Sequence, residues 1–74
     1  MRKTKHYTPI KFQKRLKEEM DKRNMTAIQL GGVLGVDRKT IYSWYLGDTC
    51  PDMMSFYKIC RLFGKTMEYM IGDD

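Results

Sequence analysis

Seventy-four residues are enough for one small domain but too few for a large catalytic cleft, and a compact helical bundle is a natural solution at this size. The formal net charge is +5, and most lysines and arginines lie within residues 1–25, so the surface suits nucleic acid, an anionic membrane, or solubility alone. Two widely spaced cysteines exclude a disulfide framework and a paired metal motif, and no secretory or transmembrane run is present, which predicts a reduced, cytoplasmic protein.

Residues 1–7 (MRKTKHY) are predicted to form a flexible basic arm, since they carry three positive charges and no apolar repeat. We place the folded domain at residues 8–74. Thr8 and Pro9 predict the start of the first helix, because a hydroxyl can cap it and proline at the first position lacks only an N–H that would be unpaired anyway. The apolar residues that follow lie four apart and predict one buried face: Phe12, Leu16 and Met20.

A second helix is predicted to follow Asn24, a plausible stop for the first helix. Thr26 and Gln29 have the spacing of a capping box, in which the hydroxyl and the amide satisfy opposite N–H groups at a helix start. Two leucines four apart provide a buried face, and a glycine able to adopt the left-handed conformation ends the helix: Leu30, Leu34 and Gly35.

Two consecutive glycines, Gly31 and Gly32, interrupt this helix, where each costs roughly 1 kcal/mol relative to alanine. A close approach of two helices at Gly31 would explain the first, because a side chain there would push them apart. We find no physical reason for Gly32. Ile28 and Val33 lie away from the leucine face and belong either to the periphery of the core or to a contact surface.

The third helix is predicted to begin after Asp37 as its cap and to end at Gly47, with Ile41 and Trp44 facing inward. The residues left facing outward are basic or polar: Arg38, Lys39, Tyr42 and Ser43. Two helices joined by a glycine-containing turn, with cations at the exposed start of the second, have the helix-turn-helix geometry that places a recognition helix in the DNA major groove.

Two further helices complete the predicted all-α, five-helix bundle. After a short loop, Asp52 is expected to cap a helix that runs to Gly64, and its apolar residues recur at helical spacing: Met53, Phe56, Ile59, Cys60 and Phe63. Thr66 is expected to cap a final short helix, which carries the apolar residues Met67, Met70 and Ile71 and ends in Gly72-Asp73-Asp74. The sequence shows no strand-like alternation and no internal repeat.

The run T-x-x-x-L-G-x-x-x-G-V-D-x-x-T-I-x-x-W-x-x-G-x-x-x-P, with the later segment GKTMEYMIG, resembles the Cro/repressor-type (XRE-like) helix-turn-helix family from about Pro9 to Gly72. The resemblance implies a compact five-helix bundle of the lambda-repressor-like type. It also implies a transcriptional regulator, acting as a repressor, that binds double-stranded DNA sequence-specifically as a homodimer. The half-sites of its pseudo-palindromic operator would lie roughly 10 bp apart. No cofactor, metal, small-molecule ligand or membrane partner is implied.

Three departures from the family pattern affect the expected site. Ala27 stands where the family usually has a glutamine that helps hold a phosphate, so one positioning contact is expected to be missing. Met20 and Tyr45 occupy the positions of a buried arginine–glutamate pair found in some members; their joint change is coherent, because an apolar pair can replace a buried ion pair without loss of stability. Leu46 replaces a polar residue at a phosphate-facing corner.

The site residues follow from the predicted helix positions and from the resemblance. We expect base readout by side chains on the exposed face of the third helix: Arg38, Lys39, Tyr42 and Ser43. Arginine suits bidentate bonding to guanine, whereas the adjacent lysine can also serve a phosphate alone. We expect phosphate contacts from hydroxyls near helix ends and from the arm: Thr26, Thr40, Thr49, Lys3 and Lys5.

The residue pattern does not favour an enzyme. The only histidine, His6, lies in the predicted arm, and no glycine-rich phosphate loop is present. Cys60 occupies an apolar helix position typical of packing. Cys50 lies in a predicted loop, where a redox role is the alternative to a purely structural one.

The sequence also allows two other functions and suggests where a dimer contact would lie. The fold could serve as an antitoxin or partner-regulated protein-binding module, a reading favoured by Ala27 and by the apolar residues Ile28, Val33 and Leu46. Peripheral membrane binding through the basic first helix is a weaker reading, because the core needs that helix's apolar stripe. A symmetric dimer contact is hypothesised on the last two helices, at Met54, Tyr57, Tyr69 and Ile71.

Overall fold

The computed structural model describes residues 10–72, and every regular element in that range is a helix. The five helices are α1 (Ile10–Lys22), α2 (Ala27–Leu34), α3 (Arg38–Leu46), α4 (Met53–Phe63) and α5 (Met67–Ile71). The predicted all-α, five-helix architecture is therefore confirmed. The predicted cap at Thr8 and Pro9 and the predicted basic arm lie outside the described residues.

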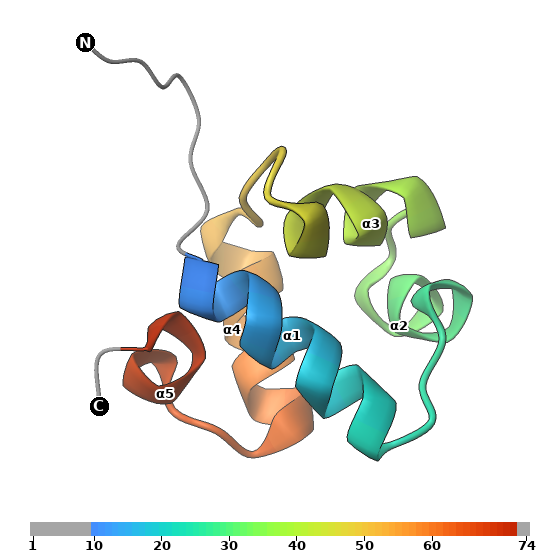
Figure 1. Cartoon of the computed structure of the whole chain (residues 1–74). Helices are drawn as coiled ribbons and strands as arrows, with labels where there is room; N and C mark the ends of the chain where they lie inside the picture. Colours follow the sequence, from blue (N-terminus) through green and yellow to red (C-terminus); the bar gives the residue numbers. More distant parts are fainter. Residues whose placement is uncertain (1–9, 73–74) are drawn as a thin grey trace, which may run out of the picture.

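Helix α1 crosses the front of the molecule, with α3 along the top, α2 beside α3, α5 at the opposite side and α4 behind α1 (Figure 1). Helix α1 packs against α3 and α5, whereas α2 packs against α3 and α4. The rings of Phe12 and Phe56 meet edge to face, with centroids 5.7 Å apart, and join α1 to α4. All five helices contribute to one core: Phe12, Leu16, Met20, Ala27, Leu30, Leu34, Ile41, Trp44, Ile59, Cys60, Phe63 and Met70.

The predicted helix ends are largely confirmed. Thr26 and Gln29 form the full capping box: the Thr26 hydroxyl accepts the Gln29 N–H at 3.1 Å, and the Gln29 amide oxygen accepts the Thr26 N–H at 2.9 Å. Asp52 caps α4 by accepting the Ser55 N–H, and Thr66 caps α5 in the same way. These local bonds fix where the chain turns, and therefore where each helix points.

Three expectations about individual residues are wrong. Asp37 precedes α3, but its side chain makes no capping hydrogen bond, and the first turn of α3 closes through the backbone carbonyl of Asp37 instead. Met53 and Met67, which belong to the apolar spacing predicted for the last two helices, are exposed rather than buried. Both are the first residues of their helices. At a helix end the apolar spacing does not determine which side of the chain faces the core.

The turn between α2 and α3 explains Gly31. A β-carbon built on Gly31 would lie 2.5 Å from the backbone carbonyl oxygen of Val36, so only glycine fits without moving the turn. The predicted close approach is confirmed, although the neighbour is the backbone of the turn rather than the body of the next helix. The Gly31 carbonyl accepts the N–H groups of Gly35 and Val36 at 2.7 and 2.9 Å, which ties the turn to α2. Gly32 faces open space, and the structure does not explain its presence.

A buried carboxylate that the sequence analysis did not identify joins α1 to the C-terminal helices. Glu19 on α1 is 1% exposed, and it forms ion pairs with Arg23 and Lys22 and accepts the Tyr69 hydroxyl at 2.9 Å. Burial alone would raise the pKa of this carboxyl, but the hydrogen bonds from Arg23, Tyr69 and Lys22 outweigh burial and lower the pKa to about 2. Arg23 also donates to the Phe63 carbonyl at 2.9 Å, so the cluster links α1 to the ends of α4 and α5.

Tyr69, one of the residues of the hypothesised dimer contact, takes part in this cluster within the chain. The Tyr69 ring is half-buried, its hydroxyl is bonded to Glu19, and the cations of Arg15 and Lys65 lie 4.2 and 4.8 Å from its centroid. Arg15 also donates to the Tyr69 carbonyl. Tyr69 therefore serves the packing of α5 on α1.

Candidate nucleic-acid interface

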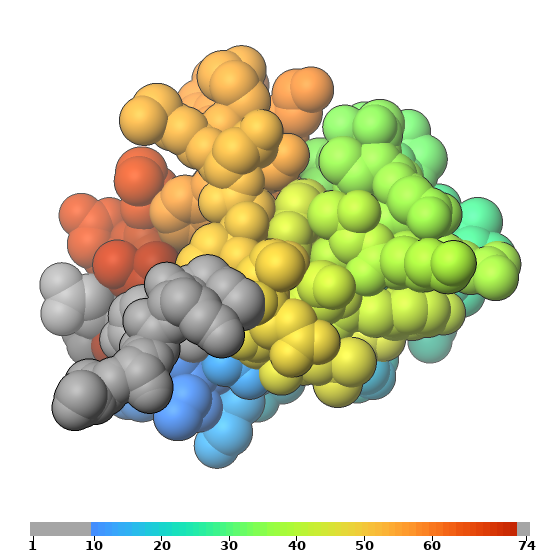
Figure 2. Space-filling model, turned by 90° about the horizontal axis from the view of Figure 1, so that it is seen from above, coloured from blue at the N-terminus to red at the C-terminus, as the bar shows by residue number. Residues whose placement is uncertain are grey.

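Helix α3 turns one side into the core and the other to solvent. Ile41 and Trp44 are buried, as predicted, whereas Arg38, Lys39 and Tyr42 are exposed. Viewed from above, the side chains of α3 occupy the middle of one broad face, bordered by α2 and by the start of α4 (Figure 2). The side chains predicted to read bases therefore lie on an accessible surface rather than in a contact between helices.

The first turn of α3 concentrates positive charge. Arg38 and Lys39 are its first two residues, and neither has a carboxylate partner within 4 Å among residues 10–72. Cations at a helix N-terminus oppose the macrodipole, a mild local cost that an anion bound there would relieve. The Asp37 side chain makes no capping hydrogen bond, so its carboxylate does not accept from the backbone N–H groups of this first turn.

An open groove of about 480 Å³ runs beside α3 and unites predicted base and phosphate contacts. Lys39, Thr40 and Ser43 line it from α3, and Thr49 lines it from the loop after Gly47. The backbone N–H of Thr49 bonds to the Ser43 carbonyl at 3.3 Å, which holds the loop against the end of α3. The groove thus places an ammonium group and several hydroxyls along one side of the exposed helix, and the Asp52 carboxylate lines it from the start of α4.

Two of the three described hydroxyls predicted to contact phosphate share this groove, and the third lies elsewhere. Thr26 precedes α2, where its exposed hydroxyl oxygen already accepts the Gln29 N–H and can still donate its own hydrogen. Ala27, at the position where the family has a glutamine, is buried and offers no polar contact. Lys3 and Lys5 lie outside the described residues.

The two positions at which some family members carry an ion pair hold side chains that lie in the core or against it. Met20 is buried and Tyr45 is half-buried against the core. The Tyr45 ring meets Tyr42 edge to face at 5.9 Å, and the Lys17 ammonium group lies 5.8 Å from its centroid. Tyr42 is thereby supported from one side by a residue that is anchored in the core.

Leu46 and Gln13 are further residues of this region. Leu46 is 66% exposed and lies one turn after Tyr42, so it shares the outward face of α3. Its exposure agrees with the phosphate-facing corner at which the sequence analysis placed it. Gln13 of α1 lies against Gly47, where a β-carbon would come within 2.8 Å of its side-chain amide. The proximity of Gln13 to Gly47 arises from the packing of α1 against the end of α3, which the sequence alone does not show.

The described residues carry few features that point to a function other than DNA binding. Cys60 is buried and Cys50 is exposed, as expected, and burial raises the pKa of the Cys60 thiol. Across residues 10–72, no group of three or more potential metal ligands occurs. None of the five described helices combines the length and the apolar character needed to cross a bilayer.

The arrangement of α2, the turn and α3 is that of a DNA-binding helix-turn-helix protein. Comparison with protein families matches residues 16–70 to the helix-turn-helix family of Cro/repressor type, whose members are DNA-binding transcription regulators. The match covers most of the chain, which therefore belongs to this family. A comparison with curated proteins found no match.

Proposed function

We propose that the protein represses transcription by binding a specific double-stranded DNA sequence with α3 in the major groove. The observation that carries this proposal is the exposed, cation-bearing face of α3 beside the groove that Thr40 and Thr49 line. A helix fits the major groove, where each base pair presents a distinct pattern of hydrogen-bond groups.

The proposed contacts divide into base readout and positioning. Arg38 is assigned bidentate contacts to a guanine, and Tyr42 contact with a thymine methyl group or a phosphate. Ser43 faces the groove and reaches either a base edge or the backbone. Lys39 lines the same groove and bonds to a base or to a phosphate. The positioning contacts are assigned to Thr26, Thr40, Thr49, Lys3 and Lys5.

Two copies are proposed to bind one operator. A single module of this size buries too little surface for tight and specific binding, whereas two copies on half-sites roughly 10 bp apart double the contacts. Repression then follows from occlusion of the promoter by the bound dimer.

Selection of bound sequences from a random duplex pool tests this proposal. We expect a motif with two-fold symmetry, bound by two protein chains per duplex, whose affinity exceeds that of a scrambled duplex at every salt concentration. If no motif emerges and both duplexes show equal affinity and equal salt slope, the basic surface attracts polyanions without reading sequence, and the proposed function is wrong.

A partner-binding role is the second candidate function. Ile28, Val33 and Leu46 were expected to form a contact surface in that case, and all three are exposed. Val33 also borders a groove on α4.

A further inference from the structure

The outer face of α4 is bordered by two grooves that share Tyr57 and Arg61. The first groove, of about 440 Å³, is completed by Val33, Lys58 and Leu62. The second, of similar volume, lies between α4 and the start of α5 and includes Cys60, Lys65 and Met67 among its lining residues. We refer to the two grooves and the helix surface between them as the α4 face.

Apolar side chains are exposed along the α4 face. Val33 is 58% exposed and Tyr57 is 50% exposed, and Leu62 and Met67 are exposed as well. These residues come from three different helices, so the exposure extends across a surface rather than along a single stripe. Nucleic acid offers little to such aliphatic groups, whereas the apolar side of a protein helix packs into grooves of this kind.

The charges on the α4 face have one sign. Lys58, Arg61 and Lys65 line the grooves, and no carboxylate does. The ion pairs among residues 10–72 all lie on α1 and the turn after it, so these three cations have no carboxylate within 4 Å. Arg61 is held in place by its hydrogen bond to the Tyr57 hydroxyl at 2.7 Å. An approaching carboxylate therefore meets a fixed cation beside an apolar groove.

From this juxtaposition we propose that the α4 face docks an acidic amphipathic helix of a partner protein. The partner's apolar side chains occupy the two grooves, and its carboxylates pair with Lys58, Arg61 and Lys65. A second copy of this chain is the wrong occupant, because two-fold pairing would set one positively charged face against another, which also argues against the dimer contact hypothesised at Met54 and Tyr57. The proposal goes beyond DNA binding and supplies the contact that a partner-regulated module needs.

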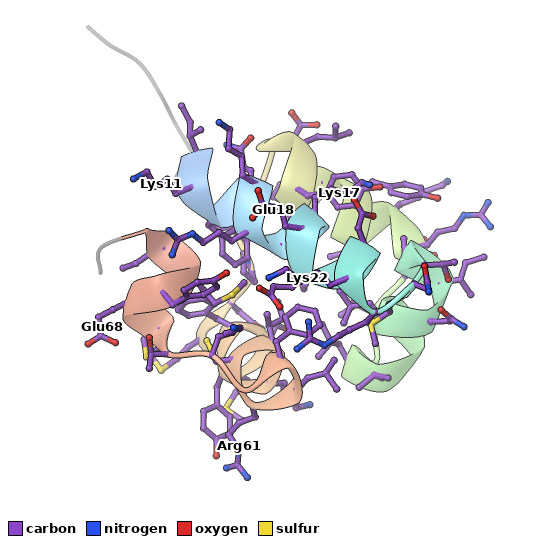
Figure 3. All side chains as sticks on the ribbon, turned by 60° about the horizontal axis from the view of Figure 1, so that its bottom comes forward. Lys11, Lys17, Glu18, Lys22, Arg61 and Glu68 are labelled. Atoms are coloured by element: carbon purple, nitrogen blue, oxygen red, sulfur yellow. The ribbon has the colours of Figure 1, made fainter. Side chains whose placement is uncertain are left out.

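The α4 face is separate from the proposed DNA contacts. Arg61 projects from the end of the molecule opposite α3 (Figure 3). No residue of α3, and neither Thr26 nor Thr49, lines either groove of the α4 face. Failure of partner docking and failure of DNA binding are therefore distinguishable by where a ligand perturbs the protein.

The test uses the full chain and two synthetic helical peptides followed by amide NMR. Both peptides carry leucine at every third or fourth position; one has glutamate at the remaining positions, and the other has lysine. We expect the acidic peptide to shift the amides of Val33, Tyr57 and Leu62, and the lysine peptide to leave them unchanged. Arg61→Glu should weaken binding of the acidic peptide about tenfold or more, because a favourable pair becomes a like-charge contact.

Lys14→Glu provides the matched control, since it makes a similar charge change at an exposed position on α1. It should leave the peptide affinity within about twofold of wild type, and Arg61→Glu should leave binding of the selected duplex unchanged. The proposal is overturned if the acidic peptide shifts only amides of α3 or shifts none, or if both peptides bind equally. Concentration-dependent shifts of the same amides without peptide would assign the face to a second copy and overturn it as well.

Discussion

Replacing Gly31 with alanine is expected to lower the free energy of unfolding by about 2 kcal/mol, because the new methyl group meets the backbone of the α2–α3 turn. The built β-carbon lies 2.5 Å from the Val36 carbonyl oxygen, which belongs to the backbone and cannot rotate away. The turn must shift, and the two hydrogen bonds that the Gly31 carbonyl accepts from Gly35 and Val36 weaken with it. This loss exceeds the gain of about 1 kcal/mol that alanine normally brings to a helix interior.

The adjacent glycine provides the control for this prediction. Gly32→Ala meets no atom within 4 Å and is expected to stabilise the protein by about 0.5–1 kcal/mol. Urea denaturation followed by the fluorescence of Trp44, the single and buried tryptophan, measures both variants. Equal effects of the two substitutions would show that the turn does not approach α2 as described.

Glu19→Gln is expected to cost about 3 kcal/mol at neutral pH, because it removes the charge from a buried, hydrogen-bonded ion pair. The glutamine amide group can accept only at its oxygen, and its NH2 then faces donors from Lys22 or Tyr69. The matched control is Glu18→Gln, the same change at the exposed neighbour, which should alter stability by less than about 0.5 kcal/mol. If both variants were equally stable, the buried cluster would not hold α1 to the C-terminal helices.

The depressed pKa of Glu19 predicts how the difference between wild type and Glu19→Gln depends on pH. The folded pKa is about 2, against an ordinary value of 4.5, so the unfolded chain takes up a proton first as the pH falls. The contribution of Glu19, about 3 kcal/mol, is complete above pH 4.5 and is lost as the pH falls towards 2. The stability curves of wild type and variant should therefore converge on acidification. A difference that stays constant from pH 7 to pH 2.5 would contradict the assigned pKa.

The residues that start and end the helices could be predicted from the sequence. The capping box at Thr26 and Gln29, the left-handed glycines at Gly35 and Gly47, and the caps at Asp52 and Thr66 are all present. These signals are strong because each involves residues at most three positions apart. Apolar spacing then predicted the buried faces of the helix interiors, including Ile41 and Trp44.

The interactions between distant residues could not be predicted in the same way. Glu19 lies three residues after Leu16 and seven after Phe12, so helical spacing places it on the buried face of α1, but nothing local shows which groups would compensate its charge. Its burial depends on Tyr69, fifty positions away. The same holds for the packing of Gln13 on Gly47 and for the loop that brings Thr49 beside Lys39. Apolar spacing alone likewise does not indicate the exposure of Met53 and Met67, which are the first residues of their helices.

The most direct test of the claim that α3 reads bases is the affinity of Arg38→Ala for the selected duplex and for a scrambled duplex across a salt series. We predict a cost of about 1–3 kcal/mol on the selected duplex, with little change on the scrambled one. Arg61→Ala, which makes the same substitution on the far side of the molecule from α3, should affect neither duplex. If Arg38→Ala weakens both duplexes equally, or matches Arg61→Ala on both, then Arg38 does not read a base and the proposed role of α3 is contradicted.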